Sequence, residues 1–300
     1  MSAGRSQLQA GPPAQASRPR IAVPANACDC HMHLYDSRFA AVRGARLVPP
    51  DATLEQYRAL QARLGTERTV CVTPSTYGFD NRCMLEAIAG LGASRKLARG
   101  VAVLDESVTD AELARLHAAG VRGVRFNLSL GVSSSAASLL PVAERIAPLG
   151  WHVQLILQPE GLLGLAPALR RLPVRVVLDH LGKIAPSQQG GAAHRLILEL
   201  LAEDRAWVKL SGAYLVTEGA SPGHEDVASL ARSYIECAPH RLVWGSNWPH
   251  ATASAGHHAW PDDAASLDQL AAWCGDESTF RQVLVDNPAC LYDFGPAPIA

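Results

Sequence analysis

Short runs of apolar residues alternate with longer stretches of helical periodicity along most of the chain. The apolar runs have the length of β-strands and lie at Ala27–Leu34, Thr69–Ser75, Leu97–Leu104, Val121–Leu128, Trp151–Leu157, Val174–His180, Ala206–Ser211 and Arg241–Ser246. Helical patterns follow them at Leu54–Leu64, Asn81–Leu91, Asp110–Ala119, Ala137–Ala147, Gly161–Arg171, Ala192–Ala202, Asp226–Cys237, Asp263–Trp273 and Glu277–Val285. Strands that alternate with helices indicate a parallel sheet. Eight such units predict a closed (β/α)₈ TIM barrel of the α/β class and not an open doubly wound sheet.

The same pattern sets the expected domain limits. Residues 1–25 contain Arg5, Arg18, Arg20 and several prolines but no apolar segment, so they are predicted to be a disordered tail and not a signal peptide. Residues 26–300 are predicted to form one barrel domain. Without an export signal we expect the protein in the cytoplasm, with its seven cysteines reduced.

Composition narrows the kind of partner. With 48% hydrophobic and 18% charged residues the chain can form a sizeable core, which excludes an intrinsically disordered protein. Its formal net charge of −1 provides no field that would attract nucleic acid or anionic lipid. The longest apolar runs are far shorter than the ~20 residues that cross a bilayer. A small molecule is therefore the expected partner, and the oligomeric state stays open.

Polar residues gather where the predicted strands end, which is the face that carries the chemistry of TIM barrels. The first strand ends in Asp29-Cys30-His31-Met32-His33, and its alternation places His31 and His33 on one side, toward the barrel mouth. His180 ends the sixth strand and His250 follows the eighth. Because several titratable groups converge on one barrel mouth, the sequence predicts a functional site there.

Five segments in this order resemble the amidohydrolase superfamily, and more narrowly its branch with 2-pyrone-4,6-dicarboxylate lactonase and galactarolactone isomerase. They are residues 29–33, 123–127, 177–183, 243–250 and 286–288. The resemblance implies an enzyme that opens or rearranges the internal ester of a small sugar acid or aromatic breakdown product. It also implies that no cofactor is required.

Asn247 is where the chain departs from the hydrolases of that branch, which have an aspartate there as the general base for water. A carboxamide cannot accept a proton at neutral pH, and it is a poor ligand for a divalent metal. The isomerase of the branch resembles this chain in having asparagine, but it lacks the first histidine of the pair, present here as His31. We expect a lactone hydrolase, with lactone isomerisation at the same site as the alternative.

The expected catalytic residues are His31, His33, His180 and Asn247. One of His180, His33 or His250 would act as the base. The developing oxyanion would be stabilised by His31, His33, Lys209 or Arg125.

Arg125 and Lys183 are the expected carboxylate anchors, with a structural ion pair to Asp179 or Asp105 as the other interpretation. Neutral hydrogen bonds are expected from Ser75, Tyr77, Asn127, Gln154 and Tyr214, and His250 completes the predicted substrate contacts. Since few arginines surround the site, this set favours a hydroxylated sugar-acid lactone over a planar dicarboxylate.

Two further hypotheses assign the protein to other functional classes. A zinc-dependent decarboxylase would bind one divalent metal through His31, His33 and His180, and it would need a strong fourth ligand where Asn247 stands. A binding protein without turnover would use the same barrel mouth, but the concentration of titratable groups there argues against it.

Overall fold

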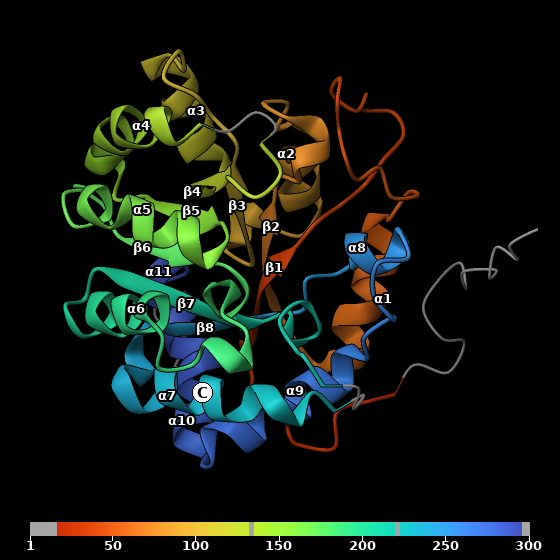
Figure 1. Cartoon of the computed structure of the whole chain (residues 1–300). Helices are drawn as coiled ribbons and strands as arrows, with labels where there is room; N and C mark the ends of the chain where they lie inside the picture. The colour runs from red at the N-terminus through yellow and green to blue at the C-terminus, as the bar shows by residue number, and fades with distance from the viewer. Residues whose placement is uncertain (1–16, 132–134, 220–222, 296–300) are drawn as a thin grey trace, which may run out of the picture.

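The computed structural model describes residues 17–131, 135–219 and 223–295, and it confirms the predicted TIM barrel (Figure 1). Eight strands follow one another around a single parallel sheet in the order of the sequence. Their bounds are β1 Cys28–Met32, β2 Arg68–Val72, β3 Ala98–Ala102, β4 Val121–Asn127, β5 His152–Ile156, β6 Val176–Leu178, β7 Ala206–Ser211 and β8 Leu242–Gly245. Each lies within one of the eight predicted runs or overlaps it closely.

The barrel closes between β1 and the residues that follow β8. Met32 and Trp248 form a parallel bridge, the amide of His33 donates to the carbonyl of Trp248 at 2.8 Å, and the amide of Asn247 donates to the carbonyl of His31 at 2.8 Å. Gly245 permits this approach, because a Cβ there would stand 2.6 Å from the Cβ of His31. The closure therefore fixes Asn247 beside the histidines of β1.

The helices surround the barrel. They are α1 Leu54–Leu64, α2 Arg82–Gly90, α3 Asp110–Ala119, α4 Leu139–Ile146, α5 Pro159–Leu169, α6 Ala192–Ala202, α7 Ala228–Cys237, α8 Ala251–Ser254, α9 Asp263–Cys274, α10 Glu277–Arg281 and α11 Asn287–Tyr292. The sequence did not predict α8 or α11. α8 is a single turn, too short to show periodicity, and the predicted helix through Val285 instead ends at Arg281 and continues through a π-helical turn into α11.

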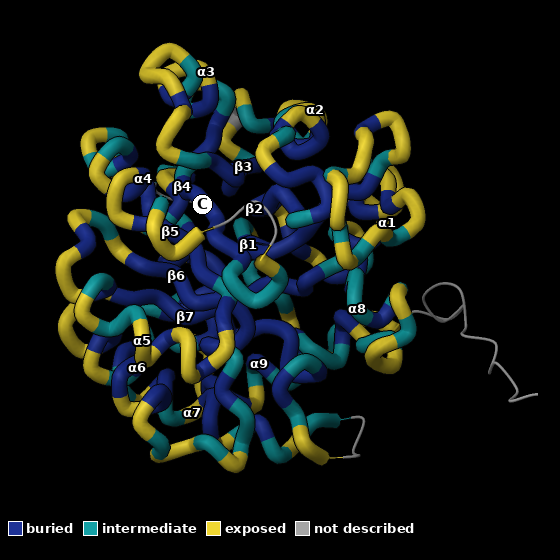
Figure 2. Tube along the Cα trace, turned by 45° about the horizontal axis from the view of Figure 1, so that its top comes forward, coloured by how far each residue is buried: buried dark blue, intermediate teal, exposed yellow. Residues whose placement is uncertain are grey.

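Buried apolar side chains fill the space between strands and helices, and the exposed residues lie on the outer turns (Figure 2). Thr53 begins α1 with a capping box, and the Thr109 side chain caps α3. Among the helices of the described ranges, none combines the length and apolarity that crossing a bilayer requires.

The structure describes the predicted tail from residue 17 onward, and residues 1–16 lie outside its described ranges. The part that is described lies against α9. The backbone amide of Arg20 donates to Asp268 at 2.8 Å, and its guanidinium Nε lies 3.0 Å from the same carboxylate. The last five residues of the predicted barrel domain, 296–300, also lie outside the described part of the chain.

Candidate active site

A cavity of about 190 Å³ opens where the strands end, with space for about six water molecules. Seven of the predicted site residues line it: His33, Ser75, Arg125, Asn127, His180, Lys183 and Asn247. The other six lie outside this lining: His31, Tyr77, Gln154, Lys209, Tyr214 and His250. The site thus has a layer that faces the cavity and a second layer behind it.

His31 and His33 form a pair in which both nitrogens of His33 already have partners. His33 Nδ1 lies 2.7 Å from the carbonyl oxygen of Val72, which can only accept, so this nitrogen carries a proton. Burial lowers the pKa of His33 to about 3, so the ring is neutral and Nε2 holds a lone pair. His31 Nε2 lies 3.2 Å away and donates to it. His33 therefore lines the cavity without a free nitrogen for a substrate.

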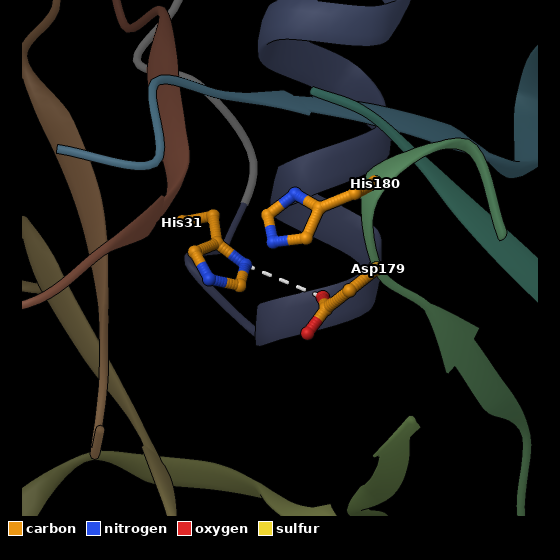
Figure 3. Close-up of side chains that lie close together, drawn as sticks. All are labelled: His31, Asp179 and His180. Atoms are coloured by element: carbon orange, nitrogen blue, oxygen red, sulfur yellow. Dashed lines mark ion pairs between the residues drawn. The ribbon is translucent and has the colours of Figure 1, made fainter. Parts of the chain in front are cut away.

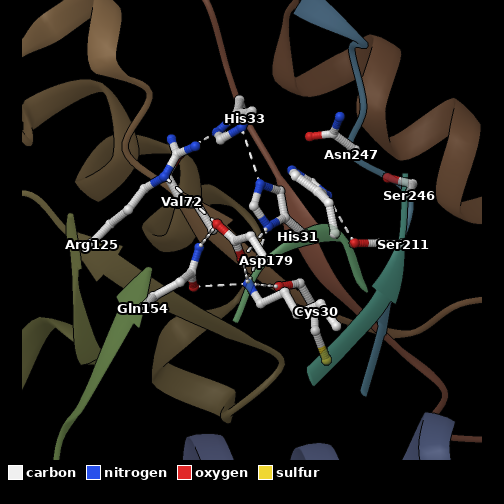
Figure 4. Close-up of polar contacts among 12 residues, drawn as sticks. Cys30, His31, His33, Val72, Arg125, Gln154, Asp179, Ser211, Ser246 and Asn247 are labelled. Carbon is white, nitrogen blue, oxygen red and sulfur yellow. Dashed lines mark hydrogen bonds and ion pairs between the residues drawn. The ribbon is translucent and has the colours of Figure 1, made fainter. Parts of the chain in front are cut away.

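Lys209 is fully buried and contacts Cys30, His31 and Gln154, which Figure 4 shows close together. Its Nζ lies 2.9 Å from the carbonyl oxygen of Cys30, 2.8 Å from Gln154 Oε1 and 3.1 Å from His31 Nδ1. An ammonium group only donates, so His31 Nδ1 accepts and the proton of the His31 ring sits on Nε2. Lys209 thus sets the tautomer that the contact with His33 requires.

Asp179 balances the charge of Lys209, with its Oδ1 3.4 Å from Nζ. Burial alone would raise the pKa of Asp179, but the neighbouring Lys209 and His31 hold it well below its usual range. Its Oδ2 accepts from Gln154 Nε2 at 2.9 Å. Gln154 and Lys209 therefore hold the ionised carboxylate in place under the cavity.

His180 stands on a strained turn after β6. Its φ is 51°, and Leu181 and Lys183 also have positive φ, a conformation rare for residues other than glycine. The Nδ1 atom lies 3.0 Å from Ser211 Oγ, so Nε2 is the ring nitrogen left for a ligand. Burial, together with His31, lowers the pKa of His180 well below its usual value, which keeps the ring neutral.

Arg125 is buried at the end of β4, and it is the residue for which the ion-pair interpretation holds. Its Nε lies 3.8 Å from Asp179 Oδ2, and its Nη1 donates to the carbonyl of Thr73 at 3.3 Å. Lys183 instead donates to the backbone carbonyl of Leu215 at 3.1 Å. Arg125 also lines the cavity, so one guanidinium can contact both Asp179 and a bound anion.

Asn247 has a φ of 64°, in the left-handed region that asparagine adopts with less strain than most residues. Its Nδ2 donates to Tyr214 Oη at 2.7 Å. Tyr214 and His250 line a smaller pocket of about 50 Å³ behind Asn247. They contact each other at 3.4 Å and lie in the second layer of the site.

Three of the predicted neutral groups lie around the loop after β2. Asn127 Nδ2 donates to Ser75 Oγ at 2.8 Å, and both residues face the cavity. The Tyr77 hydroxyl is bonded to the backbone of Asp36, from which it accepts at 2.8 Å and to which it donates at 3.2 Å. Tyr77 is therefore occupied by a loop contact.

Sequence reasoning named Asp179 only as an ion-pair partner, and it did not select three other buried residues that hold the site together: Asp29, Ser211 and Asp263. Asp29 accepts from the amide and hydroxyl of Ser246 and thereby ties β1 to the segment after β8. Burial raises the pKa of Asp29 to about 6. A signal existed for Asp29 and Asp179, since acidic residues inside apolar strands are seldom buried without a partner.

A metal ion could be held by His31, Asp179 and His180, because one ligand atom of each lies within 4.8 Å of the others (Figure 3). The Nε2 atoms of His31 and His33 are 3.2 Å apart, which also suits two ligands of one zinc ion at about 2.0–2.1 Å from each. The Lys209 ammonium opposes a cation here, since it lies 3.1 Å from His31 Nδ1 and 3.4 Å from Asp179. Asn247 supplies no carboxylate to complete the set.

Comparison with known proteins agrees with this architecture. The amidohydrolase family model matches residues 28–294. The chain is 35% identical over 294 residues to 2-pyrone-4,6-dicarboxylate hydrolase of Comamonas testosteroni, covering 93% of this chain and 94% of that protein. It is 32% identical over 281 residues to D-galactarolactone isomerase of Agrobacterium fabrum, covering 93% and 94%.

The solved structures give the same answer. A crystal structure of an Agrobacterium tumefaciens protein without ligand superposes with a TM-score of 0.84 at 31% identity, covering 93% of this chain and 100% of that one. The family model alone spans all eight strands, from β1 to β8. The chain therefore belongs to the amidohydrolase family.

Proposed function

We propose that the protein hydrolyses a small lactone of the sugar-acid type at the cavity above Asp179. The observation that carries the proposal is the arrangement of His180, whose neutral ring has Nδ1 at Ser211 and Nε2 left for the cavity that Arg125 and Asn247 also line. Two relatives, 2-pyrone-4,6-dicarboxylate hydrolase and D-galactarolactone isomerase, support the substrate class, because a 2-pyrone and a galactarolactone are both internal esters.

The reaction follows from these positions. His180 Nε2 takes a proton from water as the water oxygen bonds to the acyl carbon of the lactone. The bond between that carbon and the ring oxygen then breaks, and the leaving ring oxygen receives the proton back from His180. Arg125 stabilises the negative charge of the substrate carboxylate or of the carbonyl oxygen.

The neutral groups around the cavity support a hydroxylated substrate. Ser75 and Asn127 offer hydroxyl and amide groups at one side, and Asn247 offers an amide at the other. Arg125 and Lys183 are the cations among the predicted contacts on this lining, and both also bond within the protein. Arg46, which was not predicted, also lines the cavity, but its side chain is exposed. Of these three cations only Arg125 is buried, which suits one carboxylate and several hydroxyl groups better than a planar dicarboxylate.

Lactone isomerisation is the second candidate, and Asn247 favours it. In that reaction a hydroxyl of the substrate attacks the acyl carbon, so the site need only hold the hydroxyl near that carbon and no water has to be activated. A carboxamide can position a hydroxyl by hydrogen bonding but cannot take up its proton. His180 would perform the proton transfers in both reactions.

We also propose that the reaction needs no metal ion, because Lys209 already supplies a positive charge beside His31 and Asp179. Activity should survive exhaustive chelation followed by assay in metal-free buffer. Activity that disappears with the chelator and returns with zinc would instead support a zinc site at His31, His33 and His180, and with it the decarboxylase alternative.

A panel of sugar-acid lactones tests the proposal directly. Hydrolysis releases one acid proton for each lactone opened, whereas isomerisation shifts the carbonyl resonance in ¹³C NMR without releasing acid. We expect acid release from the wild-type protein, and its loss by at least about a hundredfold in His180→Gln, in line with the removal of a general base. Turnover of no lactone on the panel would contradict the proposed function.

A further inference from the structure

Two side chains behind the cavity, Tyr214 and His250, connect Asn247 to Asp263, the first residue of α9. Asn247 Nδ2 lies 2.7 Å from Tyr214 Oη, and this oxygen lies 3.4 Å from His250 Nδ1. His250 Nε2 in turn lies 3.0 Å from Asp263 Oδ1. All four residues are buried, so the chain of contacts runs through the interior.

Asp263 sets the direction of the hydrogen bonds. A carboxylate only accepts, so His250 Nε2 carries the proton that it donates to Asp263. With its proton on Nε2, the His250 ring accepts at Nδ1, and the Tyr214 hydroxyl donates to it. Burial raises the pKa of Tyr214, which keeps this hydroxyl protonated. The Tyr214 oxygen consequently accepts from the Asn247 amide nitrogen.

The orientation of the Asn247 amide follows from this order. With Nδ2 turned toward Tyr214, the carboxamide oxygen is left for the other side, and Figure 4 shows it on the side of His33. His33 and Asn247 both line the main cavity, whereas Tyr214, His250 and Asp263 line the smaller pocket behind it. Asn247 thus presents an acceptor to the ligand.

We propose that Tyr214, His250 and Asp263 are positioning residues that direct the Asn247 carboxamide oxygen into the cavity, where it accepts a hydrogen bond from a substrate hydroxyl. The inference rests on the proposed function and deepens it, because it assigns a selectivity for hydroxylated lactones to residues that do not line the cavity. An amide turned the other way would offer an N–H group, which pairs with a carbonyl or carboxylate instead.

The test compares Tyr214→Phe with wild type on a hydroxylated sugar-acid lactone and on the deoxy analogue that lacks the hydroxyl bonded by Asn247. A series of deoxy analogues identifies which hydroxyl that is. Loss of the Tyr214 hydroxyl frees the amide to turn, so kcat/KM for the hydroxylated lactone should fall about 10- to 100-fold. The value for the analogue that lacks the bonded hydroxyl should change less than about twofold. A merely structural role would lower both values together.

Tyr292→Phe is the matched control. Tyr292 is also a buried tyrosine, at the opposite end of the barrel, and its hydroxyl has no hydrogen-bond partner within the described part of the chain. Both substrates should be turned over by this variant at wild-type rates. Thermal unfolding of every variant verifies that the compared proteins are folded.

Asp263→Asn provides a second route to the same result. An amide at this position can donate to His250, which reverses the hydrogen bonds as far as Asn247, so this variant should lose the hydroxyl preference as well. In the double variant, kcat/KM for the hydroxylated lactone should be no lower than in either single variant, because both changes act through one chain of contacts. An undiminished hydroxyl preference in both single variants would overturn the inference while leaving the lactonase proposal intact. A wild-type protein that neither binds nor turns over a lactone would overturn the proposed function itself.

Discussion

The two ends of the barrel both bury cations, but they give them different partners. At the amino-terminal end Arg99 donates from Nε to the carbonyl of Tyr292 at 2.9 Å and from Nη2 to the carbonyl of Asp293. The guanidinium groups of Arg68 and Arg99 also lie 5.4 Å and 5.3 Å from the centre of the Phe294 ring. The two carbonyls and the ring cannot change their protonation state, and the carboxylate of Asp293, 4.0 Å from Arg99 Nη2, lies largely exposed at the surface.

At the carboxyl-terminal end of the barrel the buried cations contact side chains that can change their protonation state. Lys209 contacts His31 and Asp179, and Arg125 contacts Asp179. The arginines at the amino-terminal end of the barrel therefore hold residues 292–294 against it. The cations at the carboxyl-terminal end of the barrel set the charges and tautomers of a site. Burial of a charge does not by itself identify a functional site, and a titratable partner that is itself buried, as Asp179 is, is the distinguishing feature.

Among the substitutions that compare the two ends of the barrel, Lys209→Met should have the largest effect. It leaves the Asp179 carboxylate buried without its nearest cation and removes the donor that fixes the His31 tautomer. We expect unfolding free energy to fall by about 3–5 kcal/mol and kcat/KM to fall about 10- to 100-fold in the remaining folded protein. Urea unfolding and lactone turnover measure the two effects. Lys96→Met, at an exposed lysine, is the control, and equal effects in both variants would contradict the role given to Lys209.

Arg125→Ala should raise KM about 10- to 100-fold, because it removes a charge-assisted hydrogen bond to the substrate, while kcat changes little. An anchor distant from the reacting carbon contributes equally to binding the substrate and the transition state. Steady-state kinetics on one lactone measure both constants. A fall in kcat at constant KM would instead place Arg125 at the oxyanion.

Arg99→Met tests the other end of the barrel. The backbone carbonyls of Tyr292 and Asp293 lose their donor, so we expect a loss of about 1–3 kcal/mol in unfolding free energy. At a temperature where the variant is folded, kcat and KM should equal those of wild type. A kinetic defect in the folded variant would show that the two ends are coupled, against the comparison made above.

The sequence predicted the barrel because, from β1 to α9, each strand is a short apolar run and each long helix shows the helical periodicity of apolar residues. It also predicted that His33 and His180 would share a cavity, since both lie at predicted strand ends, and they follow β1 and β6 by one and two residues. It could not separate the layers of the site. Gln154 and Lys209 each lie two residues before the end of a strand, one layer deeper at about 3.3 Å per residue, whereas the longer Arg125 side chain reaches the cavity from the same position in β4.

The second layer behind Asn247 was hidden for another reason. Tyr214 follows β7 through a turn at Gly212, and His250 follows β8 with a left-handed φ of 58°. Loop conformation of this kind leaves no periodic pattern in a sequence, so the direction of either side chain could not be deduced. Asp263 was visible only as a residue at the start of a helix, and its contact with His250 depends on how α9 packs.

Asn247→Asp should have a small effect on rate and the most informative effect on products. Aspartate tolerates the left-handed backbone at this position nearly as well as asparagine, so the variant should fold. If the natural reaction is isomerisation, the new carboxylate supplies a base for water, and acid release should appear or increase at the expense of the rearranged lactone.

If the natural reaction is hydrolysis with His180 as the base, the same variant should gain at most a few-fold in rate. The added negative charge favours protonated histidines and so raises their pKa, which moves the acidic limb of the pH profile upward. The carboxylate also accepts from Tyr214 where the amide donated, so the Tyr214 proton turns away from His250 and the preference for hydroxylated lactones should weaken. Simultaneous measurement of acid release and carbonyl shifts on one lactone separates these cases. A variant that only isomerises, with no acid released, would show that the shape of the cavity excludes water and that the chemistry at residue 247 does not decide the reaction.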